Sequence, residues 1–165
     1  KRARLAGAGG AAQRFDMAEE VPALIELLRR IYSNKELSFE TEYPQGAIQH
    51  YDRNDLLELI GNLLDNACKW SNGRIAIHIN EGDGFTVTVE DDGPGIAEDE
   101  IVKLMQRGGR LDESQPGHGL GLAIVRDIVE LYHGKILLSH SPRLGGLKVS
   151  IKLLPFPPLD KGGIP

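Results

Sequence analysis

The sequence predicts an α+β fold, a two-layer sandwich in which helices pack on a mixed, largely antiparallel sheet. Two patterns carry this prediction: apolar residues recur at helical spacing in long segments, and they alternate with polar residues in short ones. The tetrapeptide Glu81-Gly82-Asp83-Gly84 lies between two alternating segments and is typical of a hairpin turn. A length of 165 residues, 41% of them hydrophobic and 26% charged, fits one globular domain.

Helical periodicity is clearest after Asp52, a good N-cap residue, and it stops at Ser71-Asn72-Gly73. Three further helices are expected, over residues 21–32, 97–104 and 120–132. Strand alternation covers residues 37–43, 75–79, 85–89, 136–139 and 147–153. Two hairpins therefore contribute to the sheet, the second turning across Pro142 to Gly146.

Composition divides the chain into three parts. Residues 1–15 indicate a linker or the end of an upstream helix, residues 16–154 form the domain, and residues 155–165 are expected to be a disordered, Pro-rich tail. A formal net charge of −5 argues against a nucleic-acid partner. The single cysteine, Cys68, indicates a reducing compartment. The start at Lys1 without methionine indicates a fragment or a processed chain and leaves open whether a membrane segment lies upstream.

Three polar side chains follow one face of the strongest helix. Asn62 and Asn66 are four residues apart, and Lys69 comes one turn later. Amide oxygens suit Mg²⁺ that already carries phosphate oxygens, and an ammonium group suits phosphate itself. The same pattern is also typical of an ordinary solvated helix face.

The segment Asp91-Asp92-Gly93-Pro94-Gly95-Ile96 ends a predicted strand. Strand alternation places Asp91 on the apolar face with Val87 and Val89, and Asp92 on the opposite face. A carboxylate at the edge of an apolar layer needs a donor, and the adenine amino group is a suitable one. A simple turn would explain this composition equally well.

A third motif, Gly117-His118-Gly119-Leu120-Gly121, opens the last helix, where free amides favour phosphate. It overlaps the end of a Gly-rich stretch, residues 106–119, that carries Arg107 and Arg110 and that we expect to be a mobile loop. No P-loop is present, and the glycines do not follow a strand as a Rossmann fingerprint requires. A flexible helix-entry turn would explain the glycines equally well.

Together the three motifs resemble the N, G1 and G2 boxes of sensor histidine kinases, most closely PhoQ-type sensors, over about residues 21–154. The resemblance implies a Bergerat (GHKL) fold with a mobile ATP lid. It implies that Asn66, with Asn62, binds Mg²⁺, and that Lys69 contacts phosphate. Trp70 would stack on adenine, Asp91 would accept from adenine N6, and the base would lie against Gly93, Gly95 and Ile96. A core position at the helix end is the alternative for Trp70.

For the lid, the resemblance implies phosphate contacts from Arg107 and from residues 117 to 121, with Arg110 reaching the γ-phosphate. Met105, Gln115 and His118 stand where relatives can have phenylalanine, arginine and glutamine. Related ATPases have a catalytic glutamate where this chain has Asn62, which favours phosphoryl transfer over hydrolysis. A serine kinase or ATPase of the same superfamily, or a degenerate regulatory module, remain the alternatives.

None of the five histidines has the sequence context of a phosphoacceptor. The resemblance therefore implies a histidine kinase that phosphorylates a dimerisation domain outside this fragment. It further implies a homodimeric full-length protein and a response regulator as partner. The fragment would be the soluble, cytoplasmic domain of an inner-membrane sensor.

Overall fold

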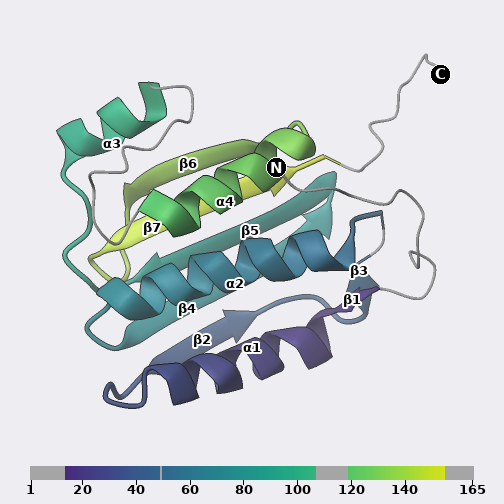
Figure 1. Cartoon of the computed structure of the whole chain (residues 1–165), viewed down its shortest axis with the longest axis horizontal. Helices are drawn as coiled ribbons and strands as arrows, with labels where there is room; N and C mark the ends of the chain where they lie inside the picture. Colours follow the sequence, from purple (N-terminus) through teal and green to yellow (C-terminus); the bar gives the residue numbers. More distant parts are fainter. Residues whose placement is uncertain (1–13, 49, 107–118, 155–165) are drawn as a thin grey trace.

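The computed structural model describes residues 14–48, 50–106 and 119–154, with side chains at all of these except 104–106 and 119–121. Helices cover one face of a five-stranded sheet (Figure 1). The helices are α1 (Met17–Ile31), α2 (Arg53–Trp70), α3 (Glu98–Gln106) and α4 (Gly119–Leu131). The five strands are β2 (Ser38–Glu42), β4 (Arg74–Gly82), β5 (Gly84–Asp91), β6 (Lys135–His140) and β7 (Leu147–Leu153). The predicted two-layer α+β architecture is confirmed.

The strand order is β2-β4-β5-β7-β6, and only the β2–β4 pair is parallel. In the central hairpin, Ile77 lies opposite Val89 and Ile75 lies opposite Asp91. Successive side chains of a strand point to opposite faces, so this register puts Asp91 at the end of an apolar row. The row consists of residues that are at most 3% exposed: Ile75, Ile77, Ile79, Val87 and Val89.

Helix α2 lies between α1 and α4 and packs across the sheet (Figure 1). Its apolar side chains recur at helical spacing and are almost fully buried: Leu56, Leu59, Ile60, Leu63, Leu64 and Ala67. Asp52 caps its first turn by accepting a hydrogen bond from the Asp55 N–H at 3.1 Å. The Tyr132 hydroxyl, at the end of α4, donates to Asp55 Oδ2 at 2.6 Å and ties the two helices together.

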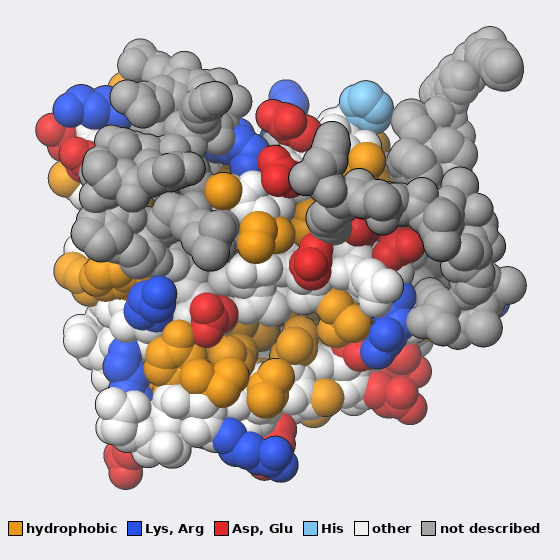
Figure 2. Space-filling model, viewed as in Figure 1, with side chains coloured by type: hydrophobic (Ala, Val, Ile, Leu, Met, Phe, Trp, Pro, Cys, Tyr) orange, Lys and Arg blue, Asp and Glu red, His pale blue; other side chains and the backbone are white. Residues whose placement is uncertain are grey.

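The exposed apolar surface includes side chains of α1. Leu27 and Ile31 are 50% and 58% exposed, and hydrophobic side chains gather over α1 and α2 in Figure 2. None of the helices within the described ranges is long and apolar enough to cross a membrane.

Phe15 corrects the sequence prediction at the start of the domain. We placed it in the linker, but it is fully buried and begins β1 (Phe15–Asp16), which pairs with β3 (Ala47–Ile48) in a separate two-stranded sheet. The residues before Phe15 are rich in Ala and Gly and show no periodic pattern, so the sequence did not indicate that this one apolar side chain is buried. The rest of the predicted linker and the Pro-rich tail lie outside the described residues.

Candidate nucleotide-binding site

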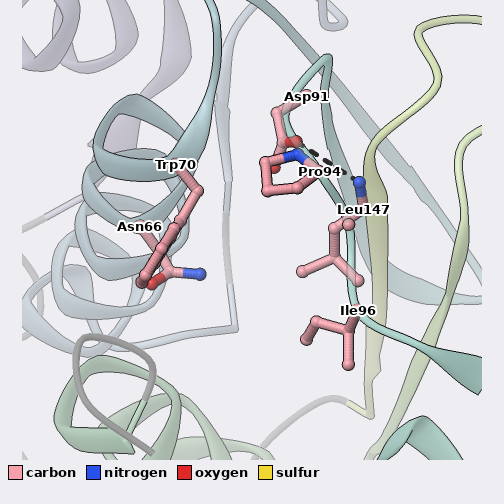
Figure 3. Close-up of a pocket in the computed structure, with 7 residues that line it drawn as sticks. Asn66, Trp70, Asp91, Pro94, Ile96 and Leu147 are labelled. Atoms are coloured by element: carbon pink, nitrogen blue, oxygen red, sulfur yellow. Dashed lines mark hydrogen bonds between the residues drawn. The ribbon is translucent and has the colours of Figure 1, made fainter. Parts of the chain in front are cut away.

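A small cleft lies between the C-terminal half of α2 and the loop that follows β5. Asn66 and Trp70 project from α2 on one side of it, and Asp91, Pro94, Ile96 and Leu147 lie on the other (Figure 3). Gly95 completes the lining. Helix and sheet thus meet here through two polar side chains and a mostly apolar wall, which is the general composition of a small-molecule site.

Asp91 is the buried acid of this cleft, at 4% exposure. Its Oδ1 accepts hydrogen bonds from the Gly93 N–H at 2.8 Å and the Leu147 N–H at 3.3 Å. Burial raises the pKa of this carboxyl, while the two N–H donors oppose the rise. Since both of these bonds end on Oδ1, Oδ2 receives no hydrogen bond from the described residues. The structure therefore leaves one carboxylate oxygen available to a ligand.

Asp92 faces the other way, as the strand alternation predicts. Its Oδ1 accepts from the Asn72 N–H at 2.7 Å and the Arg74 N–H at 3.1 Å. The Asn72 side-chain amide also donates to the Asp92 carbonyl at 2.8 Å. These bonds tie the loop after β5 to the connection between α2 and β4. Two adjacent aspartates thus serve different purposes because they lie on opposite faces of one strand.

Two glycines allow the backbones around Asp91 to come close together. A Cβ at Gly93 would lie 2.2 Å from the Trp70 carbonyl oxygen, and one at Gly146 would lie 2.3 Å from Asp91 Oδ1. Gly146 also donates its N–H to the Asp91 carbonyl at 2.9 Å. Side chains at either position would displace the wall of the cleft.

Sequence reasoning missed Pro94, Gly146 and Leu147 as parts of this site. We interpreted Pro142 to Gly146 as a hairpin turn, which is correct but local. The pairing of β7 with β5 brings the end of that turn against Asp91. No periodicity reports such a long-range contact, although the adjacent glycines at 145 and 146 were a signal of close backbone approach.

The polar line on α2 divides into different environments. Asn66 is 7% exposed and lines the cleft. Asn62 donates its side-chain amide to the Glu58 carbonyl at 2.7 Å, and Lys69 is exposed. Neither Asn62 nor Lys69 is among the residues that line the cleft. The geometry of the cleft therefore singles out Asn66.

The predicted lid falls largely outside the described residues. Arg107, Arg110, Gln115, Gly117 and His118 are not described, and neither is the side chain of Met105. Residues 119 to 121 are described by their backbone alone, which begins α4. Residues 119 to 121 of the G2 motif thus lie at the N-terminus of α4, while the lid contacts stay predictions.

Known proteins match the chain over most of its length. The family model for histidine kinase-, DNA gyrase B- and HSP90-like ATPases matches residues 51–158. Sensor protein kinase CarS of Pseudomonas aeruginosa is 46% identical over 98% of this chain and 35% of its own length. Two-component sensor PhoQ of the same organism is 37% identical over 88% of this chain and 33% of its own.

A solved structure of the mycobacterial sensor histidine kinase MprB superposes with a TM-score of 0.68 at 30% identity, over 87% of this chain and 98% of that one. The chain spans about a third of the length of the two curated relatives named above. Fold, motif order and similarity agree. The chain belongs to the histidine kinase-, DNA gyrase B- and HSP90-like ATPase family, and within it to the catalytic ATP-binding domains of two-component sensor histidine kinases.

Proposed function

We propose that this domain binds Mg-ATP in the cleft and transfers the γ-phosphoryl group to a histidine on a dimerisation domain outside this chain. The observation that carries the proposal is the buried carboxylate of Asp91, which has Oδ2 available opposite Trp70 and Asn66. The transfer forms a P–N bond to the acceptor imidazole and breaks the bond from the γ-phosphorus to the bridging oxygen, releasing ADP.

Adenine fits the donor and acceptor pattern of the cleft. An ionised carboxylate oxygen can only accept, and the adenine N6 amino group can donate to it. Guanine presents a carbonyl oxygen at the same ring position, which would face Asp91 without a proton between them. The indole of Trp70 offers a flat face across from Ile96 and Leu147, so a planar base has apolar surface on both sides.

Asn66 is the residue best placed to hold Mg²⁺. Its amide oxygen is a hard, neutral ligand, and Mg²⁺ typically keeps water and phosphate oxygens as its other ligands. The described residues contain no group of three or more His, Cys, Asp or Glu side chains that could hold a metal ion. This supports a cation that arrives with the nucleotide. Asn62 would be a second Mg²⁺ ligand and Lys69 would contact phosphate. Neither side chain lines the cleft, so both would have to change rotamer when the nucleotide binds.

Phosphoryl transfer is favoured over hydrolysis by the chemistry around Asn62. Hydrolysis needs a group that polarises water, and an amide cannot take a proton. Glu58, one turn earlier on α2, is exposed, and its backbone carbonyl accepts a hydrogen bond from the Asn62 side-chain amide. The domain would therefore supply positioning and charge neutralisation, with Arg110 and the other lid residues reaching the phosphates.

The wider assembly follows from the same proposal. A full-length homodimer would bring the acceptor helix to the cleft, and a response regulator would take the phosphoryl group from the histidine. The domain would act on the cytoplasmic side of a membrane sensor. The net charge of −5 supports protein partners in preference to nucleic acid.

Calorimetry with Mg-ATP and Mg-GTP tests the base pocket, using Asp91→Asn. Asparagine keeps one oxygen for the Gly93 and Leu147 N–H groups and places an amino group where Oδ2 was. We expect ATP affinity to fall by at least about tenfold, the cost of a lost hydrogen bond to a charged group, and the ATP-to-GTP preference to decrease. Asp83→Asn, in the exposed β4–β5 turn, is the matched control. Equal binding of ATP and GTP by the unmodified domain would refute the assignment.

Phosphotransfer is tested separately with γ-labelled ATP. The isolated domain should stay unlabelled, and a supplied dimerisation domain of a close relative should gain acid-labile label. Binding of ATP without transfer to any such acceptor would contradict the kinase assignment while leaving the ATP site intact.

A further inference from the structure

The last turn of α2 carries Trp70, and the last carbonyl groups of a helix lack N–H donors from a following turn. Lys35, in the connection between α1 and β2, donates from Nζ to three carbonyls near this end. The acceptors are the oxygens of Cys68 at 2.7 Å, Lys69 at 3.0 Å and Ser71 at 3.0 Å. An ammonium group has three donors, so one side chain uses its full capacity here. A cation at a helix C-terminus is also favoured by the helix dipole.

Two further contacts attach the same connection to α2 and to the residues after it. The Tyr32 hydroxyl donates to Asp65 Oδ1 at 2.7 Å. The Ser38 N–H donates to the Gly73 carbonyl at 2.7 Å. Residues 32–38 therefore hold the C-terminal half of α2 from the side of α1.

The loop with the nucleotide carboxylate holds the same turn from the other side. The three acceptors of Lys35 do not include the Trp70 carbonyl. That carbonyl lies against Gly93. Gly93 in turn donates its N–H to Asp91. The last turn of α2 is thus fixed between Lys35 and the Asp91 loop, and the distance across the cleft depends on both contacts.

We propose that Lys35 is a positioning residue of the nucleotide cleft, which holds the last turn of α2 so that Trp70 and Asn66 stay opposite Asp91. This inference rests on the proposed function of the cleft. No sequence motif includes Lys35, because its role depends on contacts with residues 33 to 36 positions away.

The charge of Lys35 supports the same role. Burial is the main cause of the raised pKa of Asp91, and the nearby Asp92 carboxylate adds to it. The N–H groups of Gly93 and Leu147 and the ammonium of Lys35 act in the opposite direction. Lys35 therefore also favours the ionised carboxylate that an adenine amino group needs.

The test is the substitution Lys35→Met, which keeps an apolar stem of similar length and removes the donors and the charge. Arg29→Met is the matched control, because Arg29 Nη1 donates to the Leu37 carbonyl at 2.6 Å in the same region, whereas the three bonds to the end of α2 come from Lys35. Mg-ATP affinity is measured by calorimetry at a temperature at which melting curves show every variant folded. Emission of Trp70, the only tryptophan, reports the position of the last turn.

We expect Lys35→Met to weaken Mg-ATP binding about tenfold and to shift Trp70 emission, by analogy with the lower end of the loss seen when a residue that orients a metal-binding side chain is removed. Arg29→Met should lower the melting temperature and keep full affinity, and Lys35→Arg should bind closer to the unmodified domain than Lys35→Met does. If Lys35→Met is too unstable to measure, Lys35→Gln takes its place.

Two outcomes overturn the inference: unchanged ATP affinity in folded Lys35→Met, or equal loss in Lys35→Arg and Lys35→Met. Failure of the proposed function has a different result, since the unmodified domain would then bind no ATP at all.

Discussion

Gly93→Ala is the most direct perturbation of the cleft, because it adds one methyl group at the point where helix and loop touch. The new Cβ would lie 2.2 Å from the Trp70 carbonyl oxygen and 2.9 Å from its carbon, while real Cβ atoms essentially never come closer than 3.0 Å. The backbones must separate by at least about 0.8 Å, the difference between 3.0 and 2.2 Å. Both partners are main-chain atoms, so no side-chain rotation relieves the contact.

Two consequences follow from this displacement. Overpacking of a well-packed site typically costs about 1–3 kcal/mol, and in a chain of this size each kcal/mol lowers the melting temperature by roughly 2–4 °C. Trp70 and Asp91 also separate, and a misplacement of about 1 Å in a binding constellation can cost about 100-fold in function. We expect Gly93→Ala to be measurably less stable and to lose most of its Mg-ATP affinity.

Urea unfolding and calorimetry provide the assay, and Gly82→Ala provides the control. Gly82 ends β4, and a Cβ there would meet no atom within 4 Å. The control receives the same chemical change and should keep its affinity. If Gly93→Ala binds Mg-ATP as tightly as Gly82→Ala, then contact between α2 and the loop does not set the cleft geometry and the reasoning is wrong.

Three further substitutions test separate features. Gly61→Ala should raise the free energy of unfolding by about 0.5–1 kcal/mol, since its Cβ would meet only Leu24 Cδ2 at 3.8 Å inside helix α2; a loss of stability in urea would contradict the helix assignment there. Tyr132→Phe should cost about 1.5–3 kcal/mol in the same assay, because the hydroxyl is a donor to Asp55 and an acceptor from the Asp52 N–H; a neutral effect would mean that solvent replaces it. Burial raises the folded pKa of Asp91 above its unfolded value, so the stability of the unmodified domain relative to Asp91→Asn should decrease as pH rises from about 3.9, the ordinary carboxyl value, through the folded pKa. Urea titrations of both proteins between these limits check the sign, and an opposite slope would show that the carboxylate is stabilised in the fold.

Helices and hairpins could be predicted from the sequence because their signals are local. Asp52 and the apolar repeat define α2, and strand alternation separates inward Asp91 from outward Asp92. Both patterns span only a few residues and are dictated by the geometry of one element.

Long-range contacts could not be predicted in the same way. Phe15 is a core residue inside a segment with linker composition, and its burial depends on pairing with Ile48. Gly146 and Leu147 reach the cleft only because β7 lies next to β5, and Lys35 reaches it only across α2. These residues reach the site through tertiary contacts between distant elements. The periodicity of a single sequence does not report such contacts.

The parallel β2–β4 pair and the β5–β7 contact also have a kinetic consequence. The β4–β5 and β6–β7 hairpins join neighbouring segments, whereas the Asp91 to Leu147 hydrogen bond joins residues 56 positions apart. Pairing between distant segments is slow, because the chain loses loop-closure entropy before the stabilising contacts form. We therefore expect the hairpins to form early in folding and the cleft to be completed last. A nucleotide that recognises only the finished cleft should slow unfolding and leave the folding rate almost unchanged.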